Sequence, residues 1–183
     1  NGTDIFVSKF SVDGTQLLAS TYIGGSDNDG VNTAASLTFN YGDFYRGEIN
    51  VDKDDNFVIG SSTNSANFPV TANAMQFTKD SLQDGCLFKM DSDLQNLSYS
   101  TFLGGNQDDA LFAIAISGTD VYTTGGTLST DIPASSDSYH PAFLGGAADG
   151  IVAKVSTLGI GTPRISYIGT ANFDECFFIQ IDE

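Results

Sequence analysis

Short apolar runs, many of them rich in β-branched or aromatic residues, alternate along the chain with turns rich in Gly, Asp, Asn and Ser. Such runs bounded by turn residues are typical of β-strands, and stretches rich in Leu, Lys or Glu, which favour helices, are scarce. The chain is therefore predicted to be all-β. After the first 25 residues, the runs expected to form strands are 48–51, 57–60, 86–90, 98–102, 112–116, 121–125, 151–155 and 164–167.

One segment of this pattern occurs three times. Asp4, Asp84 and Asp149 each open an apolar run that ends in Lys, and 18 residues after each Asp stands an aromatic residue followed by Ile or Leu and then Gly. The copies of this second motif are residues 22–25, 102–105 and 167–170. A constant spacing without insertions indicates a rigid structural unit, so a repeat architecture is predicted.

Each repeat can be laid out as four short antiparallel strands, which is the blade of a β-propeller. The predicted fold is thus an all-β propeller fragment of four-stranded blades, two complete and two partial. Residues 1–25 would supply the last two strands of a preceding blade, 26–105 a blade, 106–170 a second blade, and 171–183, through 176–181, the first strand of a following one. Because propellers close with about 4 to 8 blades, the chain is expected to belong to a larger polypeptide.

The first complete repeat is longer than the second. Asp4 and Asp84 are 80 positions apart, whereas Asp84 and Asp149 are 65 apart, and the 15 extra residues fall near 31–47. Neighbouring blades are expected to pack face to face. The residues predicted at these faces are Phe6, Val7, Phe88, Ile114, Val121 and Val152.

The chain is strongly acidic, with 23 Asp and Glu against 7 Lys and Arg and a net charge of −16. This charge would repel phosphate backbones and anionic membrane faces, which argues against a nucleic-acid partner. No apolar run approaches the length of a membrane span, so none is predicted. Cys86 and Cys176 fall at different offsets in the repeat and are expected to be small buried apolar residues rather than a disulfide.

The repeated acidic positions are the first candidate site. Asp29, Asp109 and Asp174 share one offset, four residues past the Gly-Gly motif, and each has a second acid beside it or close by, namely Asp27, Asp108 and Glu175. Clustered carboxylates could hold calcium, which prefers oxygen ligands. Because turn chemistry must recur in every repeat and a ligand site need not, a structural role is favoured, shared with the motif glycines Gly24, Gly25, Gly104 and Gly105.

The insertion is the second candidate site. Phe39, Tyr41, Phe44, Tyr45 and Arg46 lie within eight residues of one another. Aromatic side chains and an arginine on a loop could form a stacking surface for a sugar or a peptide. Alternatively they cover the flank of a neighbouring blade, because aromatic residues are most often packing residues. Tyr41, Phe44, Tyr45 and Arg46 are the predicted ligand-binding residues.

No catalytic constellation is evident from the sequence. His140 is the only histidine and precedes Pro141, and there is no Gly-x-Ser-x-Gly elbow and no Cys or His pattern for zinc. Lys9, Lys89 and Lys154 recur once per repeat, so they are expected to reach solvent or pair with a carboxylate. No cofactor and no enzyme activity are predicted, although paired carboxylates for glycoside hydrolysis stay open as an alternative.

The ordered motifs resemble a known family. An Asp-apolar-Phe-Val-x-Lys run, Asp-Gly, Thr-Tyr-Ile-Gly-Gly, an acidic pair, Gly-Ser-Ser and a Phe-Pro loop together resemble the bacterial seven-bladed β-propeller repeat (SBBP-type). The residues that carry this resemblance are Asp4, Phe6, Val7, Lys9, Asp13, Gly14, 21–25, Asp29, 60–62 and 68–69. The ending 174–182 is similar to the version in large surface proteins of gliding bacteria that carry a type IX secretion signal.

The resemblance implies an exported, extracellular or cell-surface protein in which the propeller serves adhesion or scaffolding, with gliding motility as the specific role. Its partners would be the remaining blades of the same polypeptide and a surface glycan, a protein partner or the export machinery. Two features depart from the pattern: Thr170 replaces the second motif Gly, and the insertion near 31–47 is unusually long.

Overall fold

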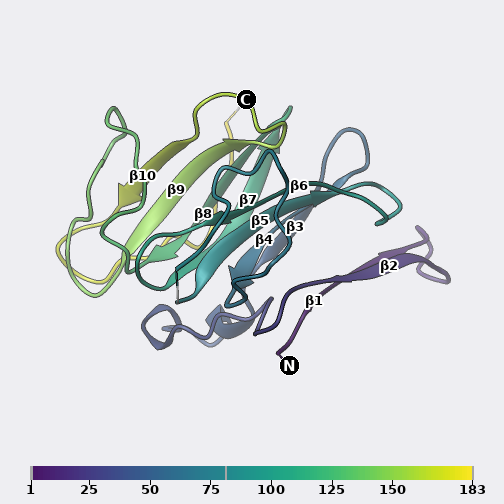
Figure 1. Cartoon of the computed structure of the whole chain (residues 1–183), viewed down its shortest axis with the longest axis horizontal. Coiled ribbons are helices and arrows are strands. Elements are labelled where there is room, and N and C mark those ends of the chain that lie inside the picture. The colour runs from purple at the N-terminus through teal and green to yellow at the C-terminus, as the bar shows by residue number, and fades with distance from the viewer. Residues whose placement is uncertain (1, 81, 183) are drawn as a thin grey trace.

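All regular structure in the computed structural model, which describes residues 2–80 and 82–182, is β-strand apart from two 3-10 turns (Figure 1). The 3-10 turns, η1 (Ala35–Leu37) and η2 (Asp43–Tyr45), lie in the insertion. The strands are β1 (Ile5–Phe10), β2 (Leu17–Ile23), β3 (Glu48–Val51), β4 (Phe57–Thr63), β5 (Asp84–Met90), β6 (Leu97–Leu103), β7 (Asp109–Ser117), β8 (Asp120–Thr127), β9 (Asp149–Ser156) and β10 (Arg164–Ile168).

The strands form two antiparallel sheets of four, in the orders β3-β4-β5-β6 and β7-β8-β9-β10, and one hairpin, β1-β2. Each sheet contains its strands in sequence order, so every connection joins neighbours. The all-β prediction and its two four-stranded antiparallel units are confirmed. The described residues do not form a closed ring of sheets, and Figure 1 shows the hairpin at the edge of the stack.

Glycines with a positive φ lie in the turns of three hairpins, β1-β2, β7-β8 and β9-β10. Gly14, Gly118 and Gly159 have φ values of 71°, 63° and 68°, a region in which a residue with a Cβ is strained. In the turn of residues 52–56, Asp52 Oδ1 accepts the backbone N–H groups of Asp54 and Asn56, both at 2.9 Å. These bonds fix the β3-β4 turn and the register of the strands on either side.

Two apolar cores hold the three units together. One lies between the two sheets and includes Val58 and Leu87 of the first and Leu111 and Ile114 of the second. The other lies between the hairpin and the first sheet, where Val7 and Ile23 pack with residues such as Phe88. Of the residues predicted to pack face to face, Val7, Phe88, Ile114 and Val121 are buried.

Two of those core predictions are wrong. Phe6 is 54% exposed and Val152 is only partly buried. Successive residues of a strand face opposite ways. Phe6 and Val152 therefore point away from the first sheet, which packs against the other face of their strands. Phe6 lies beside Tyr22, which is 70% exposed, whereas Val152 lies between Thr124 and Ser166, which are both buried.

The C-terminal segment also differs from the prediction. Residues 176–181 were expected to form a strand, but none is present there, because no strand of the described chain forms a hydrogen-bonded ladder with this segment. It is held instead by single contacts, such as the Cys176 N–H donated to the Gly125 carbonyl at 3.2 Å. Cys86 is buried, Cys176 is partly buried, and neither forms a disulfide. Among the described residues, no helix has the length and apolar character needed to cross a membrane.

Candidate functional site

The insertion is anchored to the sheets by buried polar side chains. The Gln83 side chain, fully buried just before β5, donates to Asn32 Oδ1 at 2.8 Å and accepts the Thr33 N–H at 2.7 Å. Asn32, also fully buried, donates to the Leu37 carbonyl at 2.6 Å. Because buried polar groups must be hydrogen-bonded, these contacts fix one path for the loop. The insertion is thus a shaped surface rather than a loose loop.

Arg46 joins three separate parts of the chain. Its Nε lies 3.2 Å from Asp43 Oδ1, and its guanidinium lies 4.8 Å from the centre of the Phe177 ring and 5.8 Å from that of Phe112. The two rings are stacked, with centroids 5.5 Å apart. Stacking on aromatic faces and pairing with a buried carboxylate are the contacts that arginine makes well. Arg46, predicted as a ligand-binding residue, therefore ties the insertion to β7 and the C-terminal segment.

The three predicted aromatic residues face solvent. Tyr41 is 106% exposed and Tyr45 77%, and Phe44 is also exposed. The Phe44 and Tyr45 rings meet edge to face with centroids 4.7 Å apart. We define the aromatic surface as Tyr41, Phe44 and Tyr45. The structure thus separates the four residues that the sequence grouped, with three pointing outward and Arg46 inward.

Sequence reasoning missed the residues beneath this surface. Phe177 and Phe112 hold Arg46, and Phe173 contacts Phe39 with ring centroids 5.2 Å apart. Adjacent aromatic residues at 177–178 were the available signal, but the partners of Phe177 lie far away in sequence, Phe112 by 65 residues and Arg46 by 131. Nothing in the local pattern connects the insertion to the end of the chain.

Glu175 lies in this buried junction. Its side chain packs over Gly126 of β8 and beside Leu37, and neither carboxylate oxygen has a hydrogen-bond partner among the described residues. Burial raises the pKa of Glu175 to about 7, the Asp43 carboxylate adds to the rise, and Arg46 opposes it. Glu175 therefore binds a proton near neutral pH more readily than an exposed glutamate does.

The repeated aspartates act on the glycine motif in the same way each time. Asp29, Asp109 and Asp174 each accept a backbone N–H through Oδ2 at 2.7 Å, from Gly25, Gly105 and Thr170 respectively. Ser65 and Ser129 also donate to Asp29 and Asp109, both at 2.8 Å. This geometry matches the turn-capping role that the repeat pattern favoured. At the third copy, the Thr170 hydroxyl also donates to Asp174, at 2.8 Å, so the substitution of Gly leaves the cap intact.

The preceding motif glycine separates two carboxylates. A Cβ built on Gly104 would lie 2.8 Å from Asp84 Oδ1 and 2.8 Å from Asp109 Oδ2. The two carboxylate oxygens therefore face each other across the glycine, and the distance between them cannot exceed the sum of these two distances. Both residues are fully buried. Gly24 and Gly169 lie against the corresponding pairs, Asp4 with Asp29 and Asp149 with Asp174. Only a glycine fits at such a point.

Two buried like charges so close together are unfavourable, and protonation relieves the conflict. Burial raises the pKa of Asp84 to about 8, and the Asp109 carboxylate adds to the rise. Burial also raises the pKa of Asp109 to about 7, although Gly105 and Ser129 donate to it. At the third junction, burial and Asp174 raise the pKa of Asp149.

Calcium was the open alternative for these acids. The oxygens that cap the turns already accept N–H and O–H donors, and donors oppose a cation at the same atoms. Within residues 2–80 and 82–182, no three His, Cys, Asp or Glu side chains gather in a way that could hold a metal ion. Two of the repeated lysines pair with a carboxylate as expected, Lys89 with Asp52 at 2.7 Å and Lys154 with Asp120 at 2.8 Å. Lys9 instead donates to the Ser92 carbonyl at 2.9 Å.

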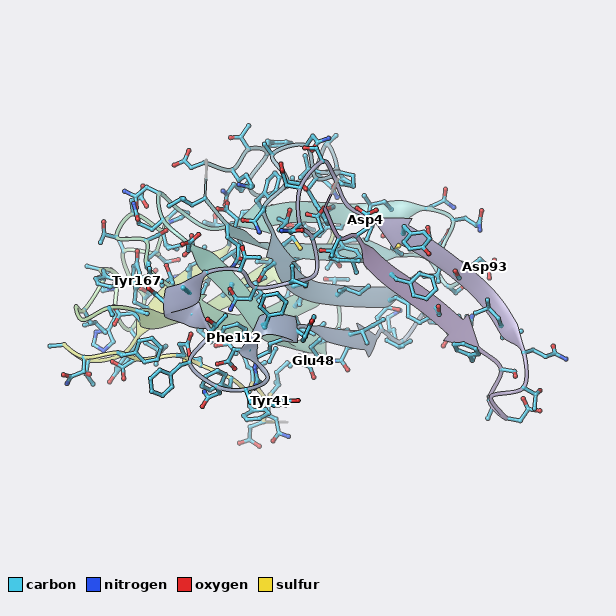
Figure 2. The ribbon with its side chains drawn as sticks, turned by 90° about the horizontal axis from the view of Figure 1, so that it is seen from below. Asp4, Tyr41, Glu48, Asp93, Phe112 and Tyr167 are labelled. Atoms are coloured by element: carbon cyan, nitrogen blue, oxygen red, sulfur yellow. The ribbon has the colours of Figure 1, made fainter. Side chains whose placement is uncertain are left out.

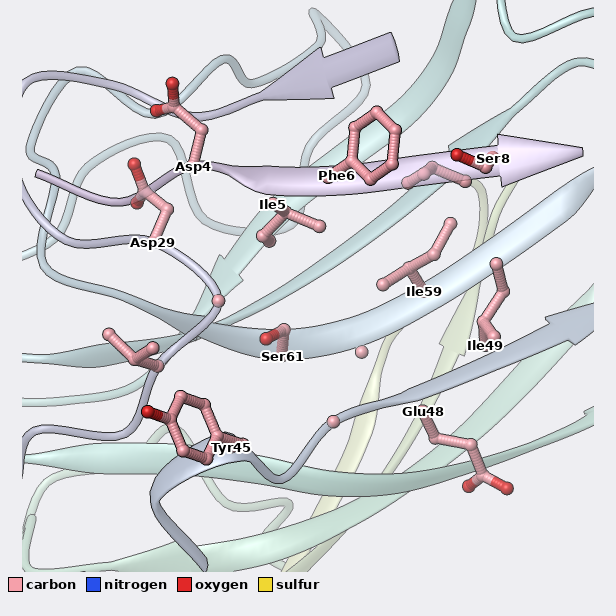
Figure 3. Close-up of a pocket in the computed structure, with 15 residues that line it drawn as sticks. Asp4, Ile5, Phe6, Ser8, Asp29, Tyr45, Glu48, Ile49, Ile59 and Ser61 are labelled. Carbon is pink, nitrogen blue, oxygen red and sulfur yellow. The ribbon is translucent and has the colours of Figure 1, made fainter. Parts of the chain in front are cut away.

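A groove lies between the hairpin and the first sheet. Figure 3 shows β1 along one side and β4 and β3 along the other, with the Ile59 and Ile49 side chains pointing toward β1. The groove encloses about 470 Å³. It reaches from Asp4, Asp29 and Tyr45 at one end toward Ser8 and Ile49, and a second hollow continues it over Val51 and Phe57. One end of the groove therefore adjoins the aromatic surface.

The chain matches no protein-family model and no curated protein sequence.

Proposed function

We propose that this chain is a non-catalytic β-propeller module of an exported bacterial cell-surface protein, and that it binds a neutral glycan through the aromatic surface. Adhesion or scaffolding at the cell surface, including the adhesion used in gliding, is the role that fits such a module.

The observation that carries the proposal is the exposure of Tyr41 and Tyr45 on an anchored loop. Exposed aromatic rings are unfavourable in water unless a ligand covers them, and they stack well on the apolar faces of sugar rings. A loop held by buried hydrogen bonds loses little conformational entropy when a ligand binds. The net charge of −16 disfavours acidic polysaccharides, which leaves neutral glycans as the ligand class.

The carbohydrate-active enzyme is the weaker alternative. A glycosidase needs two carboxyl groups that both reach the glycosidic bond. The pair with the largest pKa shifts, Asp84 and Asp109, is fully buried around Gly104, where no sugar can enter. The perturbed carboxylates therefore support a structural role and not turnover.

The test is binding of the purified chain to an array of neutral and acidic glycans, followed by calorimetric titration of each glycan that binds. Tyr41→Ala and Tyr45→Ala should each weaken binding of a neutral glycan about tenfold, equivalent to about 1.4 kcal/mol. Tyr139→Ala is the matched control, since Tyr139 is 79% exposed in a different loop. The proposal fails if no glycan binds, or if Tyr139→Ala weakens binding as much as Tyr45→Ala does.

A further inference from the structure

The hairpin strand β1 has one unpaired edge. Among the described strands, β1 pairs only with β2, whereas its equivalents β5 and β9 pair on both sides. The partners on the second side, β4 and β8, lie in one register: Thr63 is opposite Asp84, and Thr127 is opposite Asp149. Asp4 is the same repeat position on β1. The repeat therefore defines how a strand would pair with β1.

The floor of the groove beside β1 also has a buried counterpart. Ile49 pairs with Ile59 in the first sheet as Ile114 pairs with Thr123 in the second, so Ile49 and Ile114 are equivalent. Ile114 is 2% exposed and lies beneath β4, against Gly60. Ile49 is 49% exposed, in the groove beside β1. The same position is thus covered at one junction and open at the other.

From this equivalence we propose that the groove between β1 and β3-β4 is a strand-addition site, which binds an extended strand with the chemistry of β4 antiparallel to the open edge of β1. The added strand would stand to β1 and Ile49 as β4 stands to β5 and Ile114. Backbone hydrogen bonds along an exposed edge supply affinity in such sites, and the side chains on the sheet face supply selectivity. This inference does not depend on glycan binding.

The junction between β4 and Ile114 also indicates which residue the incoming strand should place over Ile49. A Cβ on Gly60 would lie 2.7 Å from Ile114 Cγ2, so the residue over that isoleucine must be glycine. The strand that covers Ile49 is expected to need glycine at the same place, opposite Val7. Within the described chain, β4 and β8 are each paired on both edges. The occupant is therefore a strand from outside the described sheets.

The experiment uses a synthetic peptide with the sequence of residues 55–64, labelled with a fluorophore and titrated into the purified chain. Fluorescence anisotropy should show saturable binding. A Gly60→Val peptide should bind at least tenfold more weakly, because its side chain would meet Ile49. Ile49→Asp in the protein should weaken binding of the original peptide by a similar factor, while Leu158→Asp, at an exposed apolar residue outside the groove, should leave it unchanged.

Amide hydrogen exchange locates the peptide. Protection of the β1 amides on peptide addition is expected, and protection elsewhere without a change in β1 overturns the proposal. Equal binding of the Gly60→Val peptide or of a scrambled peptide also overturns it. Sedimentation without peptide tests whether a second copy of the chain occupies the edge. If the chain forms a dimer that Ile49→Asp dissociates but that added peptide does not dissociate, the edge serves self-association instead.

Discussion

The buried pair Asp84 and Asp109 predicts that the fold loses stability as the pH rises. The pKa of Asp84 is about 8 in the folded chain, against 3.8 for an exposed aspartate, because the side chain is buried and faces a second carboxylate. Folding therefore takes up a proton between these two pH values. The contribution is fully present below about pH 4 and is lost as the pH rises through about 8.

Asp84→Asn removes this proton-binding group and keeps an oxygen that can accept the Gln76 side-chain N–H, which lies 3.0 Å from Asp84 Oδ2. For one proton, the free energy of unfolding changes by at most about 1.4 kcal/mol per pH unit. The variant should therefore show a shallower decline in stability from pH 5 to pH 8, by up to that slope. At pH 8 it should be more stable than the unmodified chain.

Urea denaturation followed by circular dichroism at pH 5, 6, 7 and 8 measures these slopes. Asp93→Asn is the matched control, because Asp93 is an exposed aspartate in the turn between β5 and β6 (Figure 2) and its loss changes the net charge equally. The control should keep the slope of the unmodified chain. A stability that is flat or rises from pH 5 to pH 8, or equal slopes for Asp84→Asn and the unmodified chain, would mean that the junction is ionised and would refute the reasoning.

Three further predictions follow from individual contacts. Gly104→Ala should destabilise the fold by about 2–3 kcal/mol in urea denaturation, because its Cβ would lie 2.5 Å from Asp84 Cγ. The control Gly118→Ala should destabilise it by about 1 kcal/mol, because Gly118 has a φ of 63° but open space around it. Equal losses of stability for the two variants would contradict this prediction. Lys89→Met should lower the free energy of unfolding by about 2 kcal/mol, since the ion pair of Lys89 with Asp52 is largely buried. Lys154→Met removes a more exposed ion pair and should lower it less. A larger loss for Lys154→Met than for Lys89→Met would contradict this prediction. Arg46→Ala should speed proteolytic cleavage within 31–47, because the insertion loses its contacts with Phe112 and Phe177; Arg164→Ala, at an exposed ion pair, should not.

The parts of the fold that are local in sequence were predictable. The constant distance from Asp84 to Phe102 specifies one hairpin with a fixed turn, and the same hairpin forms as β5-β6, β9-β10 and β1-β2. The aspartate caps were predictable for the same reason, because each acts on a glycine motif four residues earlier. Such features need only short-range geometry that recurs in each copy.

The parts that depend on distant contacts were not predictable. The role of Arg46 is determined by Phe112 and Phe177, and the path of the insertion by Gln83. The face on which Phe6 lies was readable from strand alternation, but whether anything covers that face was not. Pairing of Asp84 with Asp109 across Gly104 likewise brings together two strands whose approach no local pattern encodes.

The attachment of the hairpin has a consequence for how the fold responds to force. The hairpin is attached to the first sheet by side-chain packing of residues such as Val7 and Ile23 and by the hydrogen bond from Lys9 Nζ to the Ser92 carbonyl. Among the described residues, no strand ladder joins it to that sheet (Figure 1). A pull on the N-terminus meets the hydrogen bonds of Thr3 with Asn28 and Asp29 and then this apolar contact, before it reaches the strand ladders of the two sheets. The hairpin should thus detach first and reversibly, lengthening the chain and limiting the load on the two sheets behind it.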